Sequence, residues 1–120
     1  MNKFKISCLI QARCGSKRFP NKMIHKIKNR TLLDWVIKRV KKSKHIDEVI
    51  IVTSKLKQDK KIIDIAKKNK VNYFCGSHTN VLKRFVDAST KFKCENIIRV
   101  CADNIFISHK FIDEIINKYK

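Results

Sequence analysis

Short apolar runs rich in β-branched residues alternate with amphipathic stretches along the whole chain, and this alternation restricts the fold more than any other feature. The runs are nearly continuous in apolar residues, as is typical of strands that are covered on both faces. Strands that alternate with helices are joined by right-handed βαβ units. We therefore predict an α/β fold in which helices cover both faces of a parallel sheet. The strands are expected at residues 6–10, 48–53, 71–75 and 96–101.

Four helices are expected, over residues 31–42, 59–69 and 79–92 and after Ser108, which can cap the last one. Thr31 can cap the first helix, with Asp34 three positions on, close to a capping-box pattern. The side chains predicted to face the core are Leu32, Leu33, Val36, Ile37 and Val40, then Ile62, Ile63, Ile65 and Ala66, then Val81, Leu82, Phe85 and Val86, and finally Phe111, Ile112, Ile115, Ile116 and Tyr119.

The predicted order of the strands across the sheet is 3-2-1-4. In that order the chain connections leave in opposite directions between the first and fourth strands, and a crevice opens at their carboxyl ends. The chain has only two glycines and one proline, and all three follow strands: Gly15 and Pro20 the first, Gly76 the third. The ligand site is therefore expected at the carboxyl edge of the sheet.

The loop after the first strand carries the strongest candidate for ligand binding. Gly15 and Ser16 can present backbone N–H groups to an anion. Arginine binds phosphate oxygens in a bidentate manner and lysine adds a point charge, so the loop suits a polyphosphate. The P-loop and dinucleotide-binding patterns are both absent, and an ordinary basic surface loop is the alternative. The cations of the loop are Arg13, Lys17, Arg18 and Lys22.

The formal net charge is +19, which invites comparison with nucleic-acid-binding proteins. The lysines are spread over every predicted helix and loop, so a solvated lysine-rich surface is the favoured interpretation. A small basic nucleic-acid-binding module is the rival hypothesis, but no helix-turn-helix, RNP or zinc pattern supports it, and no specific nucleic acid is expected as a partner. The positive field should attract polyanions, including a nucleoside triphosphate.

The five cysteines form no C-x-x-C pair and lack the spacing of a disulfide framework or zinc site. Cys8 and Cys101 lie in apolar runs and are expected to be buried. Cys14 has no recognisable orienting histidine, which argues against a nucleophilic role. No apolar run is long enough to cross a membrane, and residues 1–5 lack a signal-peptide pattern. A cytoplasmic protein without a membrane partner is therefore expected.

A resemblance to a known family is carried by four segments in order. Residues 12–22 (ARCGSKRFPNK) resemble the signature of the cytidylyltransferases that make CMP-activated sugar acids. The spore-coat polysaccharide biosynthesis type is the most similar subgroup, and the acylneuraminate and 3-deoxy-manno-octulosonate cytidylyltransferases are related. Residues 46–54, 76–85 and 99–104 are similar to later segments of the family. The resemblance covers essentially the whole chain.

The resemblance implies a Rossmann-like, three-layer α/β/α domain of the nucleotide-diphospho-sugar transferase type. It also implies transfer of CMP from CTP to a sugar acid for surface polysaccharide synthesis, with Mg²⁺ as cofactor. By the same resemblance Arg13, Arg18 and Lys22 are catalytic and hold the triphosphate, and Asp103 helps to bind Mg²⁺. The residues assigned to nucleotide binding are Gln11, Ala12, Arg13, Gly15, Ser16, Arg18, Lys22, Ser77, Asn80 and Arg84.

Alternatives remain for several of these residues. Asp103 can be a turn or helix-entry residue, and Ser77 and Asn80 can serve in local backbone capping. Asn80 stands where the subgroup has an acidic residue, and Ala102 stands in place of a glycine. Family members continue with more strands, a homodimerisation segment and a further acidic metal ligand. Residues 1–120 are therefore expected to be a single, incomplete domain, inactive alone, or a nucleotide-binding remnant without catalysis.

Overall fold

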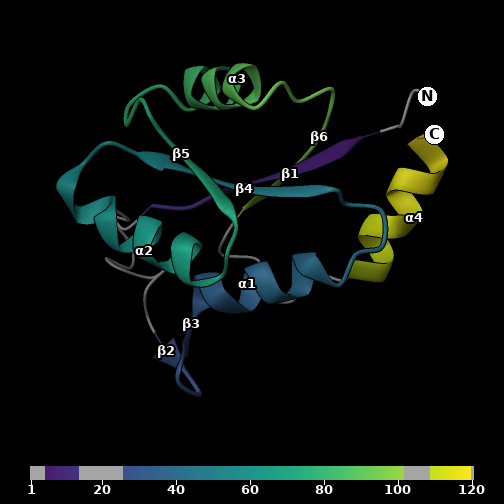
Figure 1. The fold of residues 1–120 in the computed structure, drawn as a ribbon, viewed down its shortest axis with the longest axis horizontal. Helices are drawn as coiled ribbons and strands as arrows, with labels where there is room; N and C mark the ends of the chain where they lie inside the picture. The colour runs from purple at the N-terminus through teal and green to yellow at the C-terminus, as the bar shows by residue number, and fades with distance from the viewer. Residues whose placement is uncertain (1–4, 14–25, 102–108, 120) are drawn as a thin grey trace.

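The computed structural model describes residues 5–13, 26–101 and 109–119, which form a parallel sheet with helices on both faces (Figure 1). The sheet has the order β5–β4–β1–β6, and every neighbouring pair is parallel. These are the third, second, first and fourth strands predicted, so the order 3-2-1-4 is confirmed. Their labels differ because a short two-stranded hairpin also forms. The four strands are β1 (Ile6–Gln11), β4 (Glu48–Ser54), β5 (Asn72–Gly76) and β6 (Asn96–Cys101).

The helices form two layers, one on each face of the sheet. In Figure 1, α3 lies above the sheet, and α1, α2 and α4 lie below it. Side chains alternate accordingly along β1, where Ile10 packs on the side of α1 and α2 and Leu9 packs on the side of α3. The predicted three-layer α/β/α architecture is thus confirmed. The helices are α1 (Leu32–Lys41), α2 (Lys60–Lys68), α3 (Val81–Lys91) and α4 (His109–Tyr119), and a 3₁₀ turn, η2 (Lys57–Asp59), precedes α2.

Helix α1 has the boundaries and the buried face that its sequence predicts. The Thr31 hydroxyl accepts a hydrogen bond from the Asp34 N–H at 3.0 Å, and the Asp34 carboxylate accepts one from the Thr31 N–H at 3.0 Å. This reciprocal pair is a capping box with aspartate in the usual glutamate position. All five apolar residues predicted to face the core from this helix are buried.

A two-residue hairpin before α1 is not evident from the sequence pattern. It joins β2 (Lys26–Ile27) to β3 (Arg30–Thr31), and its turn residues Lys28 and Asn29 have φ values of 53° and 69°. A turn with two positive φ values suits paired strands, but it is normally built from Asn, Asp and Gly. Lysine at the first turn position gives no such signal, so the hairpin went unpredicted.

The predicted inward faces of α3 and α4 are partly wrong. Leu82 and Val86 are 75% and 51% exposed on α3, and Phe111 and Ile115 are 60% and 46% exposed on α4. Helix α3 packs over β4 and β5, so the side of the helix that overhangs β6 is left uncovered. On α4, Ile112 and Ile116 are buried as predicted. Ser108 and the side chain of Tyr119 lie outside what the structure describes.

The cysteine predictions divide in the same way. Cys8 lies on the central strand β1 and is fully buried, which raises the pKa of its thiol to about 12. Cys101 is exposed, contrary to prediction, because it ends the edge strand β6. Cys14 lies outside the described residues. Of the helices in the described part of the chain, none combines the length and apolar character needed to cross a membrane.

Candidate functional site

The carboxyl ends of all four strands lie at one edge of the sheet. Gln11 is level with Val52 of β4 and Cys101 of β6, and Ser54 is level with Gly76 of β5. The ends of β1 and β6 are therefore level at the same edge of the sheet, where the crevice is predicted. Five assigned residues, Gly15, Ser16, Arg18, Lys22 and Asp103, lie outside the described residues.

Arg13 reaches from the end of β1 across the edge of the sheet to the loop that follows β5. Its Nη1 donates a hydrogen bond to the His78 carbonyl at 3.0 Å, and its Nε lies 3.8 Å from the carboxylate of Asp59. About a quarter of the side chain is exposed. Arg13 and His78 are 65 positions apart in sequence. Their hydrogen bond brings the loops that follow the first and third predicted strands into direct contact.

The two residues before Arg13 have different surroundings. The Ala12 side chain is buried, and its N–H donates to the Val52 carbonyl at 3.0 Å, so it continues the sheet by one bond. The side-chain Oε1 of Gln11 accepts a hydrogen bond from Arg99 Nη2 at 2.9 Å. The Arg99 guanidinium also lies over the Phe85 ring, 4.6 Å from its centroid. Gln11 and Arg99 therefore lie on an open groove between α3 and β6.

Ser77 and Asn80 organise the start of α3. The Ser77 hydroxyl accepts from the Asn80 N–H at 3.0 Å, and the Asn80 side-chain oxygen accepts from the Lys83 N–H at 3.0 Å. Asparagine caps a helix about as well as the acidic residue of the resembling subgroup, so the departure at position 80 preserves this function. The contacts described for Ser77 and Asn80 are therefore those of local helix capping.

Arg84 lies beneath the loop rather than on its surface. It is fully buried, and it donates from Nε to the Ser77 carbonyl at 2.7 Å and from Nη2 to the His78 carbonyl at 3.2 Å. Burial and the nearby charge of Arg13 lower the pKa of Arg84, and Asp59 opposes that shift. The guanidinium stays protonated at neutral pH, so it holds the loop by charge-assisted hydrogen bonds.

Gly76 permits this close approach of α3 to β5. A Cβ atom at position 76 would lie 2.8 Å from the Phe74 ring and 3.0 Å from Cγ of Arg84. The glycine is therefore required for space and not for a positive φ, since among the described residues no glycine has one.

Three residues of the site were missed in the sequence. The first two are Asp59 and Ser54, which contact each other at the carboxyl edge, where Asp59 is fully buried. Their only sequence signal is an acidic residue among the lysines of residues 55–61, directly after a strand. The third is Arg99, which belongs to a segment that carries the family resemblance but has no role assigned there.

The described residues alone do not form a metal site. Within residues 5–13, 26–101 and 109–119, no three His, Cys, Asp or Glu side chains are grouped so as to hold an ion. The buried carboxylate at this edge, Asp59, is paired with Arg13. The arrangement suits an anion, because the partly exposed Arg13 guanidinium and the start of α3 lie at the same edge.

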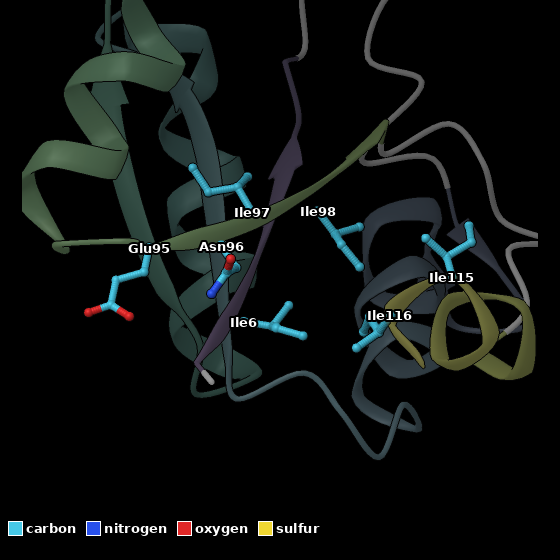
Figure 2. Close-up of a pocket in the computed structure, with 7 residues that line it drawn as sticks. All are labelled: Ile6, Glu95, Asn96, Ile97, Ile98, Ile115 and Ile116. Atoms are coloured by element: carbon cyan, nitrogen blue, oxygen red, sulfur yellow. The ribbon is translucent and has the colours of Figure 1, made fainter. Parts of the chain in front are cut away.

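A separate pocket lies at the opposite end of the sheet (Figure 2). In that view Ile6, Ile98 and Ile116 approach one another between the sheet and α4, and Glu95 points away. The pocket is mainly apolar and lies at the amino ends of β1 and β6, so it has no part in the carboxyl-edge site.

Comparison with known proteins gives consistent matches. The family profile described as Cytidylyltransferase matches residues 7–120. The spore coat polysaccharide biosynthesis protein SpsF of Bacillus subtilis is 35% identical over 119 residues, covering 92% of this chain and 48% of the relative. The 3-deoxy-manno-octulosonate cytidylyltransferase of Thermodesulfovibrio yellowstonii is 30% identical over 123 residues, covering 94% of this chain and 47% of the relative. The chain spans about half the length of the curated relatives it matches.

A solved structure also matches nearly all of this chain with about half of its own length. The cytidylyltransferase of Leptospira borgpetersenii superposes with a TM-score of 0.92 and is 34% identical in sequence. The match covers 97% of this chain and 49% of that one. The described sheet and helices thus correspond to about half of a larger solved structure.

Proposed function

The chain belongs to the cytidylyltransferase family, and we propose that its carboxyl-edge site binds CTP for transfer of CMP to a sugar acid. The observation that carries the proposal is the contact between Arg13 and the His78 carbonyl. It joins two of the segments that resemble the family's signature at one edge of the sheet. A cationic side chain and a helix start then face the same crevice, as triphosphate binding requires.

The proposed reaction needs positioning and charge neutralisation more than a covalent protein group. A hydroxyl of the sugar acid attacks the α-phosphorus of CTP and releases its proton to water. A new P–O bond forms to the sugar as the bond to the β-phosphate oxygen breaks, and pyrophosphate leaves. Arg13, Arg18 and Lys22 would hold the triphosphate and stabilise the charge on the leaving pyrophosphate.

The remaining assignments follow from where the residues lie or from the resemblance. The backbone from Gln11 through Ser16 would approach the nucleotide, and Ser77 and Asn80 would present the start of α3 to it. Arg84 would act beneath the loop, because its donors are directed to the Ser77 and His78 carbonyls. Asp103 would hold Mg²⁺ jointly with the phosphates, and the ion would neutralise phosphate charge.

The substrate class is proposed from the resemblance and from the relatives. One matched relative is named for 3-deoxy-manno-octulosonate and another for spore coat polysaccharide biosynthesis. We accordingly propose a sugar acid as the acceptor and a surface polysaccharide as the destination of the activated sugar.

Calorimetric titration with CTP, UTP and ATP in Mg²⁺ tests the proposal. CTP should bind most tightly, and Arg18→Ala should weaken it by about 2 kcal/mol, the scale of a lost charge-assisted contact. Arg39→Ala is the matched control, because Arg39 lies in the last turn of α1, near the amino ends of the strands. Equal losses of affinity in the two variants would mean that CTP is bound only by diffuse positive charge, and would contradict the proposed site.

Assays of DNA binding and of pyrophosphate release distinguish the proposed function from its rivals. A basic chain should retain DNA at low salt, and that binding should be insensitive to sequence and collapse as salt rises. Tight, sequence-selective DNA binding at physiological salt would favour a nucleic-acid-binding protein instead. CTP binding without sugar-dependent release of pyrophosphate would identify a non-catalytic nucleotide-binding domain.

A further inference from the structure

Asp59 is the residue immediately before α2, a position from which an aspartate side chain normally accepts a hydrogen bond from a backbone N–H of the first turn. Its carboxylate makes no such capping hydrogen bond. It is fully buried. Its Oδ2 instead accepts a hydrogen bond from the Ser54 hydroxyl and lies within ion-pair distance of Nε of Arg13. The side chain has therefore been diverted from local helix stabilisation to contacts at the carboxyl edge of the sheet.

The position of the Arg13 guanidinium depends on groups from two different loops. The His78 carbonyl binds Nη1, and the Asp59 carboxylate lies 3.8 Å from Nε. This Nε is buried and makes no hydrogen bond to any described group, so the carboxylate supplies its electrostatic compensation. Removing that charge would leave the guanidinium held by His78 and free to turn about the remaining contact.

A second cation, which is fully buried, makes the Asp59 carboxylate still more important. Arg84 is fully buried, and the charge of Arg13 disfavours its protonated state while Asp59 favours it. Two guanidinium groups share the His78 carbonyl. Because one of these like charges is fully buried, a nearby anion is needed to compensate it.

We propose that Asp59 is a positioning residue of the site, which through Arg13 fixes a guanidinium in the orientation that binds the triphosphate. The inference rests on the proposed function, since it concerns the same ligand. Ser54 orients Asp59 by its hydroxyl, and Asp59 orients Arg13 by its charge.

The decisive variant is Asp59→Asn, tested by calorimetric titration of the chain with CTP and Mg²⁺. Loss of a negative charge near a polyanion would by itself tighten CTP binding. A positioning role predicts the opposite sign: the dissociation constant should rise about tenfold, the scale of one lost interaction with a charged group. Asp64→Asn on the exposed face of α2 makes the same charge change and should alter it less than about twofold.

A double-mutant cycle separates positioning from a general structural effect. If Asp59 acts through Arg13, Asp59→Asn should have no further effect on CTP binding in the Arg13→Ala background. Additive losses, or unchanged or tighter binding by Asp59→Asn alone, would overturn the proposal.

A measurement on the ligand-free protein tests the positioning of Arg13 independently of CTP binding. Slowly exchanging Nε–H signals of Arg13 and Arg84 can be followed by nitrogen–proton correlation NMR. Asp59→Asn should broaden or remove the Arg13 signal and leave that of Arg84, whose Nε is bonded to the Ser77 carbonyl. An unchanged Arg13 signal would contradict the proposal, whereas failure of the native chain to bind CTP would contradict only the proposed function.

If Asp59→Asn does not fold, Ser54→Ala takes its place, because it keeps the charge and removes the orienting hydroxyl. It should weaken CTP binding about threefold, as expected for one hydrogen bond, and shift the Arg13 signal. If Ser54→Ala changes neither CTP binding nor the Arg13 signal, the proposal that Ser54 and Asp59 position Arg13 is wrong.

Discussion

Strands β1 and β6 are neighbours with similar apolar sequences, ISCLIQ and NIIRVC, but they have very different surroundings. The first five residues of β1 are all buried, whereas only Val100 is buried on β6. β1 has a paired strand on each side and helices over both faces. β6 pairs with β1, and no other described strand pairs with it. An apolar run therefore predicts a strand but does not predict how completely that strand is covered.

The candidate site lies where these two regions meet. Arg13 and Asp59 follow the central strands β1 and β4, most of whose residues are buried, and the loop at Ser77 follows β5, which is mostly half-buried. Gln11 faces the open side through its hydrogen bond to Arg99 of β6. Arg13 and Asp59, two residues of the proposed site, are thus attached to the two most buried strands of the sheet.

The largest expected difference between the regions is in the free energy of unfolding. Ile51→Ala in the centre of β4 removes a fully buried side chain and should cost about 3 to 4 kcal/mol. Ile97→Ala on β6 makes the same chemical change at 46% exposure and should cost less than about 1 kcal/mol. Urea denaturation of both variants measures the two values. Similar losses would mean that β6 is as well covered in solution as β4.

A smaller effect concerns how α4 is attached. The Asp113 carboxylate accepts hydrogen bonds from the Ser43 hydroxyl at 2.5 Å and the Lys44 N–H at 3.1 Å. Burial opposes ionisation, but these bonds and one from the His45 N–H hold the pKa of Asp113 below its ordinary value. A lowered folded-state pKa gives stability that is present above the ordinary value of about 3.9 and is lost as the pH falls through the folded value.

Asp113→Asn should therefore flatten part of the decline in stability below about pH 4. Thermal melts from pH 5 to pH 2 measure that decline. Asp87→Asn is the control, because Asp87 forms an exposed pair with Lys83 across one turn of α3. An unchanged acid response in Asp113→Asn would show that this carboxylate contributes little to attaching α4.

Local sequence signals predicted the framework of the fold well. The spacing in α1 and the Thr31–Asp34 cap depend on nearby residues, and both have the predicted geometry. The predicted strand order 3-2-1-4 agrees with the observed sheet, and right-handed βαβ connections are consistent with helices on both of its faces. Leu82 and Val86 were assigned wrongly, because periodicity gives the apolar face of a helix but not the strands over which it packs.

The site was harder to predict for a related reason. A buried Arg84 contradicts the usual expectation that arginine is exposed, and only the placement of α3 against Gly76 brings its donors to the loop carbonyls. Asp59 resembles an ordinary helix cap in the sequence. Its pairing with Arg13 depends on the position of β4 beside β1, which is a property of the assembled sheet.

The measurement that tests the central claim most directly is a map of backbone amide shifts during titration with CTP and Mg²⁺. The largest changes should occur at residues 11–13 and 77–80, where the carboxyl ends of β1 and β5 meet the start of α3. The amino-edge pocket around Ile6 and Asn96 should be unaffected. Largest changes at that pocket, or changes spread evenly over the lysine-bearing helices, would contradict a nucleotide site at the carboxyl edge.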